Sequence, residues 1–381
     1  MKILTVAGAR PNFVKIAPLM HEMRKHPSIL PMLVHTGQHY DRAMSDQFFA
    51  DLEIAPPDVN LGAGSGSHAE QTAQVMQRIE PVLAKLDPDL VLVVGDVNST
   101  LAATLVAAKL QIPVAHVEAG LRSFDRSMPE EINRIVTDAL SDLLFVTEES
   151  GRQNLMREGI NPWKIHFVGN VMIDALEATR PRWERSGIFE LLGIEHGRRY
   201  AVLTLHRPSN VDDGSTLAGV LAALQKAARR LPILLPVHPR VRQKLSQAGG
   251  IVWRDAESRE KLPDGGIVCV DPTSYLDFVA LMSRATLVMT DSGGVQEEST
   301  MLGIPCLTLR TTTERPVTVT QGTNRVIGTS PARIVEEVHA ALSRSLDRPE
   351  PPPLWDGKAS ERIVRILLDH FQIGAARAAV A

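Results

Sequence analysis

Three acidic residues in the first half of the chain could carry out acid–base chemistry. Asp96 follows the apolar run Leu90–Val94, and Glu118 follows the next apolar run along the chain. Neighbouring strands lie about 5 Å apart, so carboxylates at the ends of two such strands could share a site and shift each other's pKa. Two carboxylates whose pKa values differ in this way could act as one acid and one base. Glu130 opens a predicted helix on the same side and could join them.

Each of these acidic residues also has a purely structural interpretation. Asp96 could cap the start of a helix, and Glu130 could simply complement a helix dipole. Glu118 could pair with Arg122 on a loop. A carboxylate at the end of a buried parallel strand is costly unless it is paired or faces a cleft. The residues alone leave these alternatives open, although the position of Glu118 favours a functional role.

Basic residues and a glycine-rich turn could hold a phosphate. Arg10 lies in the Gly-Ala-Arg-Pro turn at the tip of the first apolar run, and Lys15 lies about one helical turn further on. Two cations there could grip a diphosphate. A cation at a helix start interacts unfavourably with the helix dipole, so even solvated side chains of Arg10 and Lys15 would need an anion nearby. In the second half, Ser292, Gly293 and Gly294 open a predicted helix whose backbone N–H groups a phosphate could approach.

Four more residues of the second half could complete such a site. Glu298 lies one helical turn beyond the glycines and could accept two hydroxyls of a ribose. His206 ends a predicted strand and could donate to a phosphate or a leaving oxygen, or be a satisfied structural histidine. His238, at the end of the next strand, has the same ambiguity. Arg315 could close on a phosphate, although a lone loop arginine is usually exposed to solvent.

The elements that must position these residues alternate between short apolar runs and helical patterns, which predicts parallel sheets with crossover helices. The expected strands are 3–6, 32–36, 90–94, 114–117, 143–146, 201–205, 233–237, 267–270, 287–290 and 306–309. We therefore expect an α/β fold with two Rossmann-like domains facing across a cleft. Ligands of such sheets bind at the carboxyl ends of the strands, where the polar tips could converge.

A chain of 381 residues is too long for one ordinary core. We place an N-terminal domain at 1–172 and a C-terminal domain at 173–358, with a polar, irregular crossing over 177–199. A proline-rich breaker at 348–353 precedes a last predicted helix. We expect this helix, within 359–381, to pack back on the N-terminal domain.

Composition excludes several classes of function. A net charge of −3 disfavours nucleic acid as a partner, and no apolar run approaches the ~18 residues that would span a bilayer. We expect a cytoplasmic protein without membrane insertion. Cys269 and Cys306 lie in apolar runs and are expected to be buried, reduced thiols. We predict no metal and no cofactor, because zinc spacings, a Walker A motif and a GxGxxG motif are missing from the sequence.

Taken together, the motifs resemble the non-hydrolysing UDP-N-acetylglucosamine 2-epimerases. GxRP…K, GD, HVEAGLR, PEE, NR, DSGG, QEE and TERP follow one another from Met1 to about Phe371. The resemblance implies the glycosyltransferase-B architecture and interconversion of UDP-N-acetylglucosamine (UDP-GlcNAc) with UDP-N-acetylmannosamine (UDP-ManNAc). The C2 proton leaves while UDP departs from C1, giving a 2-acetamidoglucal. UDP then adds back after proton return to the other face.

The resemblance also implies roles for individual residues. The catalytic group would be Asp96, Glu118, Glu130 and His206, with His206 serving the departing UDP. The groups that bind UDP would be Arg10, Lys15, Ser292, Gly293, Gly294, Arg315, Glu298 at the ribose and Phe278 at the uracil. Members of the family are commonly homodimers and feed the synthesis of cell-surface polysaccharides.

Some positions depart from the family pattern. The family often reads HRRE where this chain has His206–Ser209, which places a regulatory UDP-GlcNAc site in doubt. GARP, GDVNST and LRSF also look like a sister group that acts on UDP-2,3-diacetamido-glucuronic acid, but that group has TEW and QKE in place of TERP and QEE. The alternatives are a 2-epimerase of such a related UDP-sugar, a UDP-sugar glycosyltransferase, a hydrolysing epimerase and a non-catalytic sensor.

Overall fold

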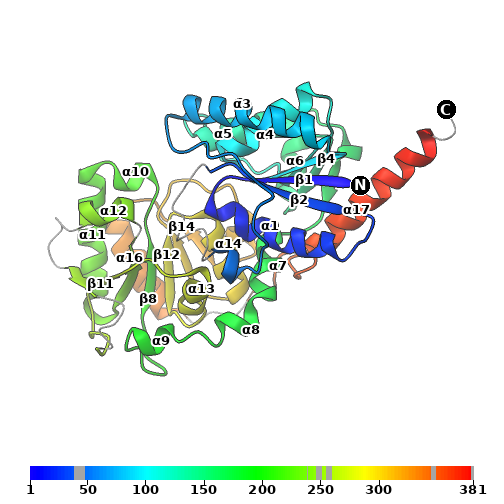
Figure 1. Cartoon of the computed structure of the whole chain (residues 1–381). Coiled ribbons are helices and arrows are strands. Elements are labelled where there is room, and N and C mark those ends of the chain that lie inside the picture. Colours follow the sequence, from blue (N-terminus) through cyan, green and yellow to red (C-terminus); the bar gives the residue numbers. More distant parts are fainter. Residues whose placement is uncertain (38–47, 238, 246–250, 255–259, 345–348, 379–381) are drawn as a thin grey trace. The chain divides into compact units, whose positions relative to one another are not determined.

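The structure is a computed structural model that describes residues 1–37, 48–237, 239–245, 251–254, 260–344 and 349–378. The chain divides into two compact units (Figure 1). The N-terminal unit comprises Met1–Ala178 and Pro353–Ala381, and the C-terminal unit comprises Thr179–Pro352. Each unit is built on a sheet of its own, and the expected α/β class is confirmed.

The sheet of the N-terminal unit has seven parallel strands within the described residues, in the order β3-β2-β1-β4-β5-β6-β7. The strands are β1 (Lys2–Ala7), β2 (Leu30–His35), β3 (Val59–Asn60), β4 (Leu90–Val94), β5 (Val114–Ala119), β6 (Leu143–Val146) and β7 (Ile165–Phe167). Every residue of β4 is buried, as expected for a central parallel strand covered on both faces. Because β1, β4 and β5 are parallel neighbours, their carboxyl ends lie next to one another along one edge of the sheet.

Helices cover both faces of this sheet. They are α1 (Arg10–Arg24), α3 (His68–Leu86), α4 (Asn98–Lys109), α5 (Pro129–Leu140), α6 (Glu149–Arg157), α7 (Val171–Ala178) and α17 (Ala359–Ala378). One layer contains α3, α4 and α5, packed in that order, and another contains α1, α7 and α17 (Figure 1).

The C-terminal segment returns to the N-terminal unit through specific polar contacts. Asp174, buried on α7, accepts hydrogen bonds from the backbone N–H groups of Ala359 and Ser360 and from the Ser360 hydroxyl. These bonds satisfy N–H groups at the start of α17 that have no partner within the helix. The indole of Trp355 donates to the carbonyl of Thr147 at 3.0 Å. Helix α17 then packs against α1 and α7.

The C-terminal unit repeats the architecture, with seven parallel strands among its described residues in the order β10-β11-β9-β8-β12-β13-β14. The strands are β8 (Ala201–Thr204), β9 (Ile233–Pro236), β10 (Ile251–Trp253), β11 (Ile267–Val270), β12 (Leu287–Thr290), β13 (Cys306–Thr308) and β14 (Asn324–Val326). The helices are α8 (Arg180–Trp183), α9 (Ile188–Leu191), α10 (Pro208–Val211), α11 (Gly214–Ala227), α12 (Pro239–Leu245), α13 (Tyr275–Ser283), α14 (Gly293–Leu302), α15 (Val317–Thr320) and α16 (Pro331–Ser343).

All ten predicted strands occur, and their ends match the predicted bounds or differ from them by at most two residues. Four further strands of the described chain were not predicted: β3, β7, β10 and β14. Each has two or three residues and lies at an outer edge of its sheet. Such strands lack the continuous apolar run of a central strand, because they are covered less completely. The crossing at 177–199, expected to be irregular, contains the single-turn helices α8 and α9.

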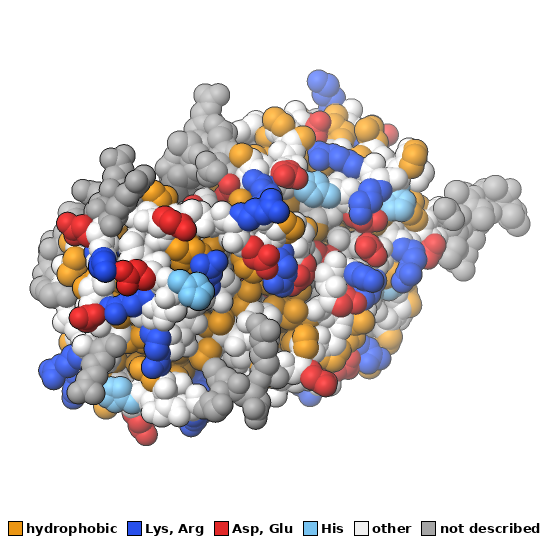
Figure 2. All heavy atoms as spheres, turned by 90° about the horizontal axis from the view of Figure 1, so that it is seen from below, with side chains coloured by type: hydrophobic (Ala, Val, Ile, Leu, Met, Phe, Trp, Pro, Cys, Tyr) orange, Lys and Arg blue, Asp and Glu red, His pale blue; other side chains and the backbone are white. Residues whose placement is uncertain are grey.

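The surface carries charges of both signs. On the face that Figure 2 shows, Lys and Arg side chains are interspersed with Asp and Glu among the residues drawn in colour. No helix of the described residues is long and apolar enough to cross a membrane. In the same part of the chain, no cluster of three or more His, Cys, Asp or Glu residues is placed to hold a metal ion. Both cysteines are free and buried, as predicted.

Candidate active site

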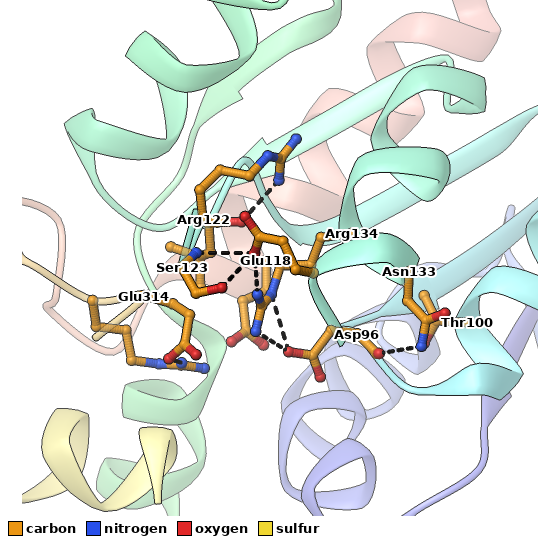
Figure 3. Close-up of polar contacts among 12 residues, drawn as sticks. Asp96, Thr100, Glu118, Arg122, Ser123, Asn133, Arg134 and Glu314 are labelled. Atoms are coloured by element: carbon orange, nitrogen blue, oxygen red, sulfur yellow. Dashed lines mark hydrogen bonds and ion pairs between the residues drawn. The ribbon is translucent and has the colours of Figure 1, made fainter. Parts of the chain in front are cut away.

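The carboxylate of Asp96 lies at the end of β4 in an ion pair with helix α5. Its Oδ2 is 2.6 Å from Nη2 and 3.1 Å from Nε of Arg134 (Figure 3). The backbone carbonyl of Asp96 accepts a hydrogen bond from the Asn133 amide at 2.8 Å. The cap of α4 is Val97, without a side-chain cap bond, so Asp96 does not serve as a helix cap. A quarter of the Asp96 side chain stays exposed, which leaves it reachable by a ligand.

Glu118 occupies a strained position near the end of β5. The pairing of β5 with β6 shifts register between Val117 and Ala119, and Glu118 at this bulge has φ of +74°. A left-handed conformation costs a non-glycine residue about 1–3 kcal/mol, and a bulge re-aims the side chain. The buried carboxylate forms an ion pair with the ammonium of Lys15 from α1. The bulge thus presents this carboxylate to a cation on another element.

Gly95 lies directly against the Lys15–Glu118 ion pair. Gly95 has φ of +68°, and a Cβ atom there would lie 3.0 Å from Lys15 Nζ and 3.6 Å from Glu118 Oε2. A side chain at this position would therefore push on the ion pair. The turn that carries Asp96 and the pair that holds Glu118 are consequently built around one small residue.

The alternative of a Glu118–Arg122 pair is not supported, because the guanidinium of Arg122 contacts Asp138 and Glu158. Asp96 and Glu118, which we expected to be able to share a site, each form an ion pair with a cation, Arg134 or Lys15. The structure thus holds two separate ion pairs at neighbouring strand ends.

The start of α5 contains two acidic residues with different surroundings. Glu131 is buried and accepts hydrogen bonds from the Ser123 and Phe124 backbone N–H groups, each at 2.9 Å, and from Arg134 Nη1 at 2.6 Å. Glu130 is half-buried, and no hydrogen bond or ion pair joins its side chain to another described residue. Glu131 therefore fixes the preceding loop and orients Arg134, whereas Glu130 is the acid that can meet a ligand.

Sequence reasoning treated Glu131 only as a partner of the helix dipole and gave no role to Arg134. Their spacing of three residues on a predicted helix was the available signal, because side chains three apart lie on the same face. Asn12 was also missed. Its amide oxygen accepts from the backbone of Gly8 and Ala9, and its amide nitrogen donates to the Val94 carbonyl. Asn12 therefore ties the turn after β1 to the end of β4.

Arg10 begins helix α1, directly after the short turn that follows β1. Its side chain lies outside the described residues, as does the whole of His238. Lys15 is more than one turn further along α1 and is buried.

In the C-terminal unit, His206 follows β8 and is held by a buried aspartate. Its Nδ1 is 2.8 Å from Oδ1 of Asp291, which also accepts from the backbone N–H groups of His206 and Arg207. Burial opposes ionisation of Asp291, but the bonds from His206 and the backbone hold the pKa of this carboxyl below its usual value. The His206 side chain is 48% exposed. Since Nδ1 is engaged, Nε2 is the nitrogen that can meet a ligand.

The start of α14 combines a glycine with a buried cation. Ser292 is the N-cap of this helix, and Gly293 and Gly294 are its first residues. A Cβ atom on Gly293 would lie 2.4 Å from Nη1 of Arg315. Arg315 is buried and donates from Nε to Glu297 Oε1 at 2.8 Å, so it is not the solvent-exposed loop arginine of the alternative interpretation. Backbone N–H groups and a guanidinium together suit an anion.

Glu298 lies in an environment that disfavours its charge. It is buried and accepts a hydrogen bond from the Tyr275 hydroxyl at 3.0 Å. Burial, with the nearby charge of Glu297, raises the pKa of Glu298 to about 8, although the bond from Tyr275 acts in the other direction. Phe278, half-buried, lies three residues after Tyr275 on α13. Sequence reasoning missed Tyr275.

An α/β enzyme of nucleotide-sugar chemistry fits these features. One Rossmann-like unit has two carboxylate–cation pairs, and the other has a histidine and a helix start with two glycines beside an arginine. The sequence model of the family described as UDP-N-acetylglucosamine 2-epimerase matches residues 21–368. The chain belongs to this family.

Relatives match over nearly the whole chain. A UDP-N-acetylglucosamine 2-epimerase of Methanocaldococcus jannaschii is 41% identical over 373 residues, which cover 96% of this chain and 99% of the relative. A UDP-2,3-diacetamido-2,3-dideoxy-D-glucuronate 2-epimerase of Pseudomonas aeruginosa is 39% identical, with 96% and 99% covered. The crystal structure of the M. jannaschii UDP-GlcNAc 2-epimerase in complex with UDP-GlcNAc and UDP is 40% identical, covers 97% of this chain and 99% of that chain, and has a TM-score of 0.87.

Proposed function

We propose that this protein is a non-hydrolysing isomerase that interconverts UDP-GlcNAc and UDP-ManNAc by inversion at C2. The observation that carries this proposal is the pair of carboxylate–cation contacts, Asp96 with Arg134 and Glu118 with Lys15, at neighbouring strand ends. Full-length similarity to a UDP-GlcNAc 2-epimerase supports the same substrate. Inversion needs one group to remove a proton from one face and another to return it on the other face, and two carboxylates meet that need.

The leaving group must be stabilised for this chemistry to proceed. The C2 proton of the sugar is weakly acidic because no carbonyl adjoins that carbon, so charge that develops on departing UDP has to be neutralised. In our proposal, His206 Nε2 donates toward the diphosphate, the α14 start (Ser292, Gly293, Gly294) and Arg315 bind it, and the intermediate is a 2-acetamidoglucal.

Lys15 links the carboxylates to the diphosphate in this proposal. Its ammonium forms an ion pair with Glu118. A diphosphate that binds this ammonium would compete with Glu118 for it, so substrate binding would change the surroundings of the carboxylate. Arg10 would add a second cation for the same diphosphate. Glu130, which has no partner among the described residues, is the third candidate for proton transfer.

The remaining UDP contacts are proposed from the family resemblance. Glu298 would accept ribose hydroxyls, and Phe278 would lie beside the uracil. A carboxyl with a raised pKa is easily left neutral, and a neutral carboxyl can both donate to and accept from a hydroxyl. A homodimer, a cytoplasmic location and a role in cell-surface polysaccharide synthesis also stay predictions.

A second substrate deserves a direct comparison, because a relative at 39% identity is named a UDP-2,3-diacetamido-2,3-dideoxy-D-glucuronate 2-epimerase. Proton NMR of the purified protein with each UDP-sugar separately tests the choice. We expect UDP-GlcNAc to give a new anomeric signal of UDP-ManNAc until equilibrium is reached. Turnover of only the diacetamido-glucuronate would replace our substrate, and release of free N-acetylmannosamine with UDP would mean a hydrolysing enzyme.

A further inference from the structure

A completely buried histidine connects β5, α5 and the end of β4, close in sequence to the two carboxylates. His116 lies on β5, two residues before Glu118, and none of it is exposed. Its Nδ1 is 2.6 Å from Oδ1 of Asp138 on α5. Its Nε2 is 2.8 Å from the carbonyl oxygen of Gly95 at the end of β4. The mechanism described above makes no use of this residue.

The partners of His116 determine how many protons it carries. A neutral imidazole has one N–H group and one acceptor nitrogen. The carboxylate of Asp138 and the carbonyl of Gly95 both accept hydrogen bonds. Both contacts can therefore be hydrogen bonds only if both ring nitrogens donate. The ring is then an imidazolium, and its bond to Asp138 is a charge-assisted one.

The surroundings of Asp138 keep the shared proton on the ring. Its Oδ2 accepts from the Gly120 backbone N–H at 3.0 Å and lies 2.7 Å from Nη2 of Arg122. Burial opposes ionisation of this carboxyl, but His116 and Arg122 hold the pKa of Asp138 below its usual value. A carboxylate that already accepts hydrogen bonds from two other donors binds a proton weakly, so the shared proton stays on the imidazole.

Gly95, the backbone partner of His116, lies next to both carboxylates. The Gly95 N–H donates to the Val117 carbonyl at 3.0 Å, and its carbonyl accepts from His116. Both backbone polar groups of Gly95 are thus held by β5. Gly95 immediately precedes Asp96 and lies against the Lys15–Glu118 pair. A displacement of Gly95 would move both carboxylates relative to each other.

We propose that His116 is a positioning residue: a doubly protonated imidazole, held by Asp138, that fixes the Gly95–Asp96 turn and thereby the spacing of the two carboxylates that transfer the C2 proton. The inference rests on the proposed function. It concerns the turnover step and not the binding of UDP, because the hydrogen-bond partners of His116 among the described residues are Asp138 and Gly95, which are not proposed UDP ligands.

Two substitutions separate the hydrogen bond from the charge. His116→Phe removes both ring N–H groups and releases the Gly95 carbonyl. Asp138→Asn gives Nδ1 an amide donor, so the ring becomes neutral and keeps its Nε2–H bond to Gly95. Misplacement of catalytic groups by about 1 Å can lower a rate by about 100-fold. We expect a loss of that order in kcat for His116→Phe, a smaller loss for Asp138→Asn, and little change in KM in either.

A matched control and a spectroscopic measurement complete the test. His166→Phe changes a partly buried histidine of the same sheet, on β7, and should leave kcat unchanged. Nitrogen-15 NMR of the imidazole rings should find two protonated nitrogens on His116 in the wild type and one in Asp138→Asn. This spectrum does not depend on turnover, so it tests His116 even if UDP-GlcNAc proves not to be the substrate.

Two results would overturn the proposal. One is a folded His116→Phe variant that binds UDP normally and keeps the wild-type kcat. The other is a wild-type ring with a single protonated nitrogen at neutral pH. If His116→Phe does not fold, the kcat of Asp138→Asn and the wild-type spectrum decide. A wild type that leaves UDP-GlcNAc unchanged would instead contradict the proposed function.

Discussion

Arg134 holds Asp96 through two nitrogens, with Nη2 at 2.6 Å and Nε at 3.1 Å from the same carboxylate oxygen. The same guanidinium donates from Nη1 to the buried Glu131 at 2.6 Å. One arginine on α5 therefore positions a partly exposed carboxylate at a strand end and neutralises a buried one beside it. This sharing predicts that Arg134 matters for both stability and turnover.

Replacing Arg134 by methionine should destabilise the fold. The change leaves Glu131 without a cation in the interior, and breaking a buried ion pair costs about 3–5 kcal/mol. Urea unfolding measures the loss. Arg325→Met is the matched control, since Arg325 pairs with Glu337 in a partly exposed position and such pairs contribute about 0–1 kcal/mol. Equal effects of the two changes would contradict the role given to Arg134.

Asp96→Asn should abolish most of the turnover and leave UDP binding intact. A group that transfers a proton in the transition state contributes about 10²–10⁴-fold to the rate, and an amide cannot replace it. Kinetics with UDP-GlcNAc and calorimetry with UDP measure the two effects. Asp264→Asn changes an aspartate whose side chain is 99% exposed and serves as the control. Unchanged turnover in Asp96→Asn would rule out this carboxylate as acid or base.

Gly95→Ala tests the close approach of Lys15 and Glu118. The new methyl group would meet Lys15 Nζ, in addition to the strain of a side chain at φ of +68°. Gly159→Ala is a matched control, because Gly159 has φ of +84° with no neighbour within 4 Å. The control carries only the backbone strain, of about 1–2 kcal/mol. We expect both variants to lose stability and only Gly95→Ala to lose turnover. Full activity in Gly95→Ala would show that the ion pair tolerates displacement.

The stability of the ligand-free protein should depend on pH through Glu298. Its pKa rises from an ordinary 4.5 to about 8 on folding, so the folded state binds more protons between these values. This contribution is fully present below about pH 4.5 and is lost as pH rises through about 8. Glu298→Gln should remove the dependence and be more stable than the wild type at pH 8, by on the order of a few kcal/mol.

Urea unfolding at pH 5 and pH 8 measures this difference. Glu80→Gln, an exposed change on α3, is the control and should follow the wild type at both pH values. A Glu298→Gln variant with the wild-type pH profile would mean that the folded protein accommodates the charged carboxylate at little cost.

The central strands could be predicted from the sequence because their apolar runs are long and continuous. Leu90–Val94 and Leu287–Thr290 have the predicted bounds, since parallel strands covered on both faces need apolar residues at every position. The edge strand β3, with two residues, offers no such pattern. Its pairing with β2 depends on tertiary contacts that a short sequence window does not contain.

The residue types of the site could also be predicted, but their partners could not. The strand-end positions of Asp96 and Glu118 follow from the apolar runs before them. The pairing of Glu118 with Lys15 depends on the bulge at Glu118, and no sequence signal marks a left-handed glutamate. In the sequence, His116 is simply one residue of a predicted buried strand. Its connection to Asp138 becomes visible only once α5 is placed against β5.

The most direct test of the account is proton NMR of the protein with UDP-GlcNAc in deuterated water. Proton removal and return at C2 predicts that UDP-ManNAc appears with deuterium at C2, and that deuterium also enters C2 of the remaining UDP-GlcNAc. Asp96→Asn should slow both processes together. Formation of UDP-ManNAc that retains the original C2 proton would contradict proton exchange through these carboxylates, and with it the proposed mechanism.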